Sequence, residues 1–339
     1  MLESPAVSGK ASRPEWNVVG HEWAVDSLRR AVECGDVFHA YLFSGQPGVG
    51  KTALARSLAA ALLCQSEGER PCNACRSCRL VAQSGHPDLH VVESEHVGAS
   101  LKIAQVRELQ RQLALTPFEG QYRVAVLRRF GEATTAAANA LLKTLEEPPP
   151  YVVLVVLAKD ADQLLPTIFS RCRHIPLRPL PLDLVRQALI ERWNVEPDQA
   201  ELLARLSGGR LGWASEAIAN ETALDSRDER LDDLERLLRA PLVERFRYAE
   251  KMAGDKVAML ATLDLWTSAW RDVMLLAAGA EAELANVDRR GKMQSLAERY
   301  GVERSNRVLQ AIRSTVNLLK RNANKRLTLE VLMLDLPRP

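Results

Sequence analysis

Eight consecutive residues have the types and spacing of a loop that binds phosphate. Residues 45–52 read GQPGVGKT, which fits the pattern G-x-x-x-x-G-K-[ST]. In such a loop, glycines let backbone N–H groups surround phosphate oxygens, the lysine reaches the terminal phosphates and the hydroxyl binds magnesium. A glycine-rich turn that binds nothing is the alternative. The residues predicted to form the site are Gly45, Gly48, Gly50, Lys51 and Thr52.

The acidic residues that ATP hydrolysis requires are missing from their expected place. A buried strand is predicted at 124–127, and a strand beside a phosphate loop commonly ends in a carboxylate that holds magnesium, with a second one to activate water. This strand runs into Arg128 and Arg129, whose guanidinium groups neither bind magnesium nor accept a proton. ATP with Mg²⁺ is therefore a possible ligand that is not hydrolysed. An active ATPase that uses Glu132 instead is the competing hypothesis.

Four of the six cysteines lie close together in the sequence. Their spacing is C-x7-C-x2-C-x2-C, and clustering of this kind in a cytosolic chain favours a metal over disulfides. Four thiolates suit tetrahedral zinc and leave no position open for water, so we predict a structural Zn²⁺ site. Free thiols, or a redox pair, are the alternatives. The predicted ligands are Cys64, Cys72, Cys75 and Cys78.

These candidate sites lie among alternating strand and helix patterns. Short apolar runs predict strands at 40–44, 89–92, 124–127 and 152–157. Helical patterns between them predict a mostly parallel sheet covered by helices on both faces. Beyond Pro181 the patterns are helical. The predicted fold is an α/β P-loop domain with a parallel sheet, followed by a small helical lid domain and an all-α carboxyl-terminal domain.

We place domain boundaries where these patterns change. The predicted parts are a disordered lead at 1–15, a nucleotide-binding-type domain at 16–178 that contains the cysteine module at 64–78, a helical lid at 179–222 and a helical domain at 223–339.

Composition indicates a globular chain. Of 339 residues, 47% are hydrophobic and 26% charged, and the net charge of +2 argues against DNA binding over the whole surface. No apolar run is long enough to cross a membrane, and the amino-terminal segment lacks the apolar core of a signal peptide. We therefore expect a cytoplasmic location.

Several segments together resemble the AAA+ subunits of the bacterial DNA polymerase III clamp loader, from about residue 16 to 336. They are HAYLFSG at 39–45, the cysteine cluster, NALLKTLEEPP at 139–149, SRC at 170–172 and the stretch at 318–334. The family contains hydrolysing gamma/tau subunits and non-hydrolysing delta-prime subunits.

The sequence departs from the gamma/tau pattern at several positions, and in these it resembles the delta-prime class. Arg128 and Arg129 replace an Asp-Glu pair, and no threonine stands around Lys159. The arginine that senses the γ-phosphate would fall near Gly212, so Arg210 is a possible substitute displaced in the sequence. The resemblance implies a stator subunit of the polymerase holoenzyme, and an active gamma/tau-like clamp-loader ATPase is the alternative.

The resemblance also implies partners and a catalytic contact. Arg171 of the SRC segment would act in trans as an arginine finger at a neighbouring gamma/tau site, whereas the simpler interpretation is a surface arginine. The implied partners are gamma/tau and delta in a ring of five, with the sliding clamp and primer-template DNA reached through the complex, and no membrane. Residues 223–339 would form the collar that holds the ring together. A stand-alone zinc-stabilised DNA-binding module is a third hypothesis, which the near-zero net charge disfavours.

Overall fold

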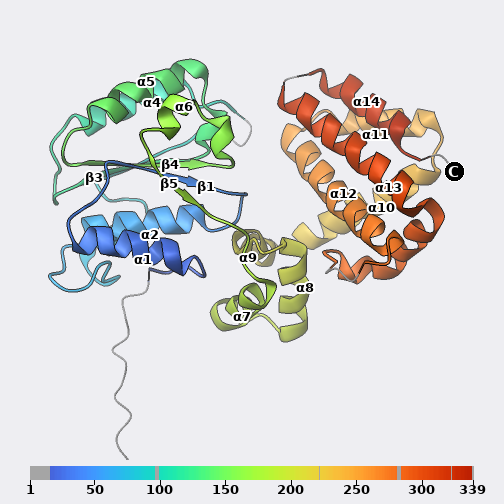
Figure 1. Cartoon of the computed structure of the whole chain (residues 1–339), viewed down its shortest axis with the longest axis horizontal. Coiled ribbons are helices and arrows are strands. Elements are labelled where there is room, and N and C mark those ends of the chain that lie inside the picture. Colours follow the sequence, from blue (N-terminus) through green and yellow to red (C-terminus); the bar gives the residue numbers. More distant parts are fainter. Residues whose placement is uncertain (1–15, 96–98, 221, 281–283, 322, 338–339) are drawn as a thin grey trace, which may run out of the picture. The chain divides into compact units, whose positions relative to one another are not determined.

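The computed structural model describes residues 16–95, 99–220, 222–280, 284–321 and 323–337 (Figure 1). The chain forms two compact units that divide between Pro179 and Leu180. The lead predicted at 1–15 lies outside the described residues.

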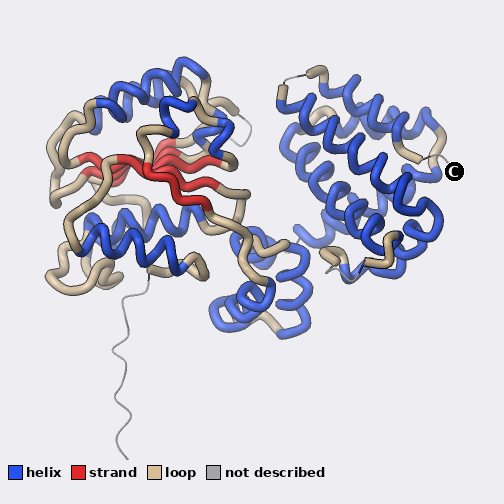
Figure 2. Tube along the Cα trace, in the orientation of Figure 1, coloured by secondary structure: helices blue, strands red, loops and turns tan. Residues whose placement is uncertain are grey.

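A parallel sheet forms the centre of the first unit (Figure 2). The strand order is β2-β3-β4-β1-β5, and neighbouring strands pair in parallel. The four predicted strands are confirmed. A fifth, β5, lies at one edge and was missed, because its sequence Arg-His-Ile-Pro contains no apolar run, whereas the other edge strand, β2, reads Leu-His-Val-Val. The strands are β1 (Ala40–Ser44), β2 (Leu89–Val92), β3 (Arg123–Leu127), β4 (Val152–Ala158) and β5 (Arg173–Pro176).

Helices cover both faces of this sheet (Figure 1). Because successive strand residues point to opposite faces, Val153 and Val155 of β4 join the core beneath α1 and α2, whereas Leu154 and Val156 join the core beneath α4 and α5. This arrangement confirms the predicted α/β class. The helices of this unit are α1 (Glu22–Glu33), α2 (Lys51–Leu63), α3 (Arg76–Ala82), α4 (Ile103–Leu113), η1 (Phe130–Glu132), α5 (Thr135–Glu146), η2 (Ala161–Gln163) and α6 (Pro166–Phe169).

The second unit is helical throughout its described residues, as predicted. Helices α10 to α14 share one apolar core in which Trp266 and Trp270 are fully buried, and α13 is interrupted at Gly301, where φ is 63°. No helix in the described part of the chain is long and apolar enough to cross a membrane. The helices are α7 (Leu182–Trp193), α8 (Pro197–Ser207), α9 (Leu211–Ala219), α10 (Thr222–Arg239), α11 (Leu242–Met252), α12 (Lys256–Ala277), η3 (Val287–Arg289), α13 (Arg290–Lys320) and α14 (Lys325–Asp335).

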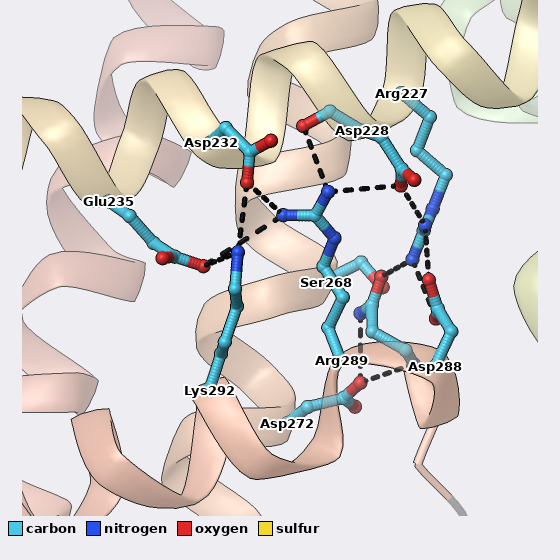
Figure 3. Close-up of polar contacts among 10 residues, drawn as sticks. Arg227, Asp228, Asp232, Glu235, Ser268, Asp272, Asp288, Arg289 and Lys292 are labelled. Carbon is cyan, nitrogen blue, oxygen red and sulfur yellow. Dashed lines mark hydrogen bonds and ion pairs between the residues drawn. The ribbon is translucent and has the colours of Figure 1, made fainter.

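A buried polar network joins α10 and α12 to the turn before α13 (Figure 3). Asp272 of α12 is fully buried and accepts hydrogen bonds from the Asn286 backbone N–H at 2.7 Å and from Asn286 Nδ2 at 2.8 Å. Arg227 of α10 donates to Asn286 Oδ1 at 2.7 Å and to Asp288 Oδ2 at 2.7 Å. Nearly every buried group in this network thus has a charged or amide partner, which fixes the turn against both helices.

Candidate nucleotide-binding loop and zinc centre

The predicted phosphate-binding residues form the loop between β1 and α2. Gly45 has φ of 145°, and a Cβ placed there would lie 2.3 Å from the Leu177 carbonyl oxygen, so no other residue fits. Gly50 has φ of 107° and precedes the first turn of α2. The loop therefore has the strand–loop–helix setting in which backbone N–H groups and a helix N-terminus favour an anion.

Lys51 lies inside this loop. Its Nζ donates to the carbonyl oxygens of Gly45 and of Gln46, the latter at 2.7 Å. Burial and, to a smaller extent, the nearby charge of Lys159 together lower the pKa of Lys51 to about 8. Lys159 directly follows β4, where the Ala158 and Lys159 carbonyls each accept the Gly45 N–H at 3.2 Å. A second cation thus stands beside the loop, where the resemblance leads us to expect a threonine in hydrolysing subunits.

His21 also supports the loop, and the sequence analysis missed it. Its Nε2 lies 2.9 Å from the Val49 carbonyl oxygen, and since a carbonyl only accepts, the imidazole N–H must donate. His21 is buried at the start of α1 and has φ of 59°. A single histidine before a helix gave no sequence signal for this contact.

The end of β3 carries two arginines that are paired with carboxylates of the same chain. Arg128 Nη1 lies 3.2 Å from Glu93 Oε2, and Arg129 Nη2 lies 3.7 Å from the same oxygen. Glu132 accepts a hydrogen bond from Ser94 Oγ at 3.1 Å and lies 3.6 Å from Arg129 Nε. Both nearby carboxylates are therefore occupied by cations or a hydroxyl of this chain, an arrangement that opposes magnesium binding. Glu93 was not singled out from the sequence.

The four clustered cysteines come together in space. All four Sγ atoms lie within 4.8 Å of one another, with 4.0 Å between Cys64 and Cys75 and 3.9 Å between Cys72 and Cys78. Zinc–sulfur bonds of about 2.3 Å in a tetrahedron place sulfurs about 3.8 Å apart. The four thiols are therefore close enough to bind one zinc ion.

Backbone hydrogen bonds favour the thiolate form of Cys72 and Cys75, whereas burial raises the pKa of Cys64 and Cys78. The Cys75 N–H donates to Cys72 Sγ at 3.3 Å, and the Cys78 N–H donates to Cys75 Sγ at 3.4 Å. Although burial acts in the opposite direction, such hydrogen bonds lower the pKa of Cys75 to about 6. Cys64 ends α2 and Cys78 lies in α3, so a bound ion would fasten these two helices together.

Arg171 lies in the turn between α6 and β5 and has partners within its own chain. Its Nη2 lies 2.8 Å from Glu146 Oε1, at the last residue of α5. Its Nη1 donates to the Thr167 carbonyl at 3.0 Å and to Ser170 Oγ at 3.4 Å. The neighbouring Cys172 points inward, and burial raises the pKa of its thiol to about 12. The arginine therefore faces outward from a fixed turn.

Arg210 lies in the second unit, directly before α9. Its Nε donates to the Ser207 carbonyl at 2.7 Å, and its guanidinium lies 5.9 Å from the centre of the Trp213 ring. These contacts hold the side chain against its own helices.

Comparison with known proteins identifies the family. Residues 20–181 match the model of the family described as DNA polymerase III, delta subunit, and residues 224–337 match that of its carboxyl-terminal part. The delta-prime subunit of Bacillus subtilis is 30% identical over 276 residues, which cover 77% of this chain and 79% of that protein. The chain belongs to the delta-prime family of DNA polymerase III clamp-loader subunits.

Other similar proteins include delta-prime and gamma/tau subunits of DNA polymerase III. The delta-prime subunit of Pseudomonas aeruginosa is 40% identical over 178 residues, covering 50% of this chain and 53% of that protein. The gamma/tau subunit of Mycobacterium tuberculosis is 38% identical over 201 residues, covering 57% of this chain but 34% of that longer protein. A gamma subunit-related protein of Thermotoga maritima aligns over 92% of this chain and 97% of its own, with 18% identity and a TM-score of 0.43.

Proposed function

We propose that this chain is the stator of a clamp loader: a subunit that completes the ring, hydrolyses no ATP itself and supplies Arg171 to the ATP site of a neighbouring gamma/tau subunit. The residues at the end of β3 support the proposal that this chain hydrolyses no ATP. Arg128 and Arg129 stand where hydrolysis needs carboxylates, and both pair with Glu93. Glu132 is held by Ser94 and Arg129, so it is a poor replacement.

The intact phosphate loop supports a more specific proposal, in which this chain binds ATP without hydrolysing it. Gly45 and Gly50 adopt positive φ, and Lys51 Nζ lies within the loop, where it donates to the carbonyl oxygens of Gly45 and Gln46. Binding therefore remains chemically reasonable, whereas water activation lacks a free carboxylate. We propose that ATP, when bound here with Mg²⁺, is held and not turned over.

Three features of Arg171 support the proposed role as an arginine finger. It follows α6 in a short turn, its side chain is about one third exposed, and a guanidinium presents several N–H donors to phosphoryl oxygens. Arginines supplied in trans raise phosphoryl-transfer rates by roughly 10³–10⁵ in GTPases. The neighbour is a gamma/tau subunit, and delta, the sliding clamp and primer-template DNA complete the assembly.

The zinc cluster and the helical second unit have structural roles in this proposal. Four cysteine ligands leave no coordination position for a substrate, so the ion would hold α2 and α3 together. Helices α10 to α14 would form the collar that binds the other subunits, with their buried core giving it rigidity.

Reconstitution tests the proposal. Gamma/tau, delta and the clamp are combined with primed DNA, with or without this chain, and clamp loading is measured. We expect loading to require the chain. Equal loading in its absence would refute the stator role.

A further inference from the structure

The ion pair between Glu146 and Arg171 joins two elements that are far apart in the sequence. Glu146 is the last residue of α5, and Arg171 follows α6. Glu146 Oε1 and Arg171 Nη2 form an ion pair, with 2.8 Å between the two atoms. It acts together with the Thr167 carbonyl, which accepts from Nη1 of the same guanidinium.

Helix stability does not explain a carboxylate at this position. The carboxyl end of a helix carries partial negative charge, which disfavours a nearby anion. Glu147 follows directly and is also exposed, yet no side-chain contact is found for it among the described residues. Of the two adjacent acidic residues, Glu146 is the one that contacts the arginine.

Phosphoryl groups and carboxylates compete for the same guanidinium N–H groups. In this chain Nη1 of Arg171 donates to the Thr167 carbonyl, and Nη2 faces the Glu146 carboxylate. A phosphate of a neighbouring subunit that approaches Nη2 would therefore compete with Glu146 for it.

We propose that Glu146 is a positioning residue that restrains Arg171 within its own subunit until the phosphate of the neighbour's nucleotide displaces it. This inference rests on the proposed finger role of Arg171. The ion pair restrains Arg171 weakly, because the side chains of Arg171 and Glu146 are 35% and 49% exposed and water screens their attraction. A doubly charged phosphoryl group can displace a partner of this strength.

Removing the charge of Glu146 should strengthen the contact between Arg171 and the phosphate of the neighbour's nucleotide. Exposed ion pairs contribute little, so Glu146→Gln is expected to lower the apparent KM for ATP at the site facing Arg171 by up to roughly fivefold. The maximal rate should change less than the KM, because the arginine contacts that act on the bound nucleotide are kept. Glu147→Gln is the matched control, since it removes the same charge one residue away.

The experiment uses the assembled loader with primed DNA and clamp. ATP turnover is measured over a range of ATP concentrations for the wild type and for Glu146→Gln and Glu147→Gln, each with Arg171 and with Arg171→Ala. The Arg171-dependent turnover is the difference between the two backgrounds. We expect its KM to fall in Glu146→Gln alone.

The outcomes distinguish a failure of the proposed Glu146 restraint from a failure of the proposed Arg171 finger role. If Arg171→Ala lowers turnover but Glu146→Gln behaves as wild type, the restraint is wrong and the finger role stands. An effect of Glu146→Gln that persists with Arg171→Ala, or that Glu147→Gln reproduces, also overturns the restraint. If Arg171→Ala leaves turnover unchanged, the finger role itself fails, and the restraint fails with it.

Discussion

Asp272 offers a measurable test of how the second unit is held together. Its carboxylate is fully buried and accepts two hydrogen bonds from Asn286, at 2.7 Å and 2.8 Å (Figure 3). It also accepts a longer one from the Ala285 N–H, at 3.3 Å. Asn286 in turn receives Arg227 from α10. Asp272 is therefore the central acceptor between α12 and the turn before α13.

The cost of Asp272→Ala follows from these contacts. Hydrogen bonds to a charged group contribute about 1.5–3 kcal/mol each, and two short ones are lost, so the unit should lose about 3–5 kcal/mol of stability. Asp272→Asn keeps one carbonyl acceptor and should lose about 1–2 kcal/mol. Asp264 lies exposed on the same helix, and Asp264→Ala should stay within about 0.5 kcal/mol of wild type.

Amide hydrogen exchange on peptides from α12 and α13 measures this effect within the full chain. At 1.4 kcal/mol per factor of ten, Asp272→Ala should raise the opening constant of the slowest amides by about a hundredfold to a few thousandfold. Exchange within about threefold of wild type would refute the assigned role, since that change corresponds to less than about 1 kcal/mol.

Two further predictions concern the candidate sites. We expect the wild type to bind one zinc ion per chain, measured by metal analysis, and Cys78→Ser to abolish this binding. Cys34 lies outside the cluster, so Cys34→Ser should retain the zinc. A wild-type protein without zinc would contradict the site. ATP binding at the loop should weaken as pH rises through about 8, because Lys51 loses its proton there and bound phosphate favours the protonated form. Lys159→Ala should move this loss to higher pH, since it removes a cation that lowers the Lys51 pKa. Binding of a fluorescent ATP analogue is measured as a function of pH for both proteins. The same pH dependence in Lys159→Ala and wild type would contradict the account of Lys51.

Much of the first unit could be predicted from the sequence because its signals are local. The strands β1 and β4 are unbroken apolar runs buried along their length, and the cysteine spacing shows directly which thiols can meet. The strand β5 was not predicted because its sequence Arg-His-Ile-Pro has no apolar run, whereas β2, at the other edge, has three aliphatic residues of four.

Contacts between distant segments were beyond prediction from the residues alone. The pairing of Glu93 with Arg128, and that of Glu146 with Arg171, each depend on how separate elements pack, and neither has a periodic pattern. The sequence did show that arginines replaced the expected acids after β3. The structure adds that neighbouring carboxylates are held by those cations.

The division of the second unit was predicted only from a change in pattern near residue 222. Helix α9 ends at Ala219 and α10 begins at Thr222, and a domain boundary between these two helices remains a prediction.

The central claim is that this chain acts on ATP held by its neighbour and does not hydrolyse ATP of its own. ATP turnover by the assembled loader, stimulated by clamp and primed DNA, tests it most directly when single changes are made in this subunit alone. Arg171→Ala should lower turnover by at least the share of one gamma/tau site, whereas Lys51→Ala and the control Arg173→Ala should leave turnover unchanged. The opposite result, in which Lys51→Ala removes one site's share and Arg171→Ala has no effect, would contradict the account.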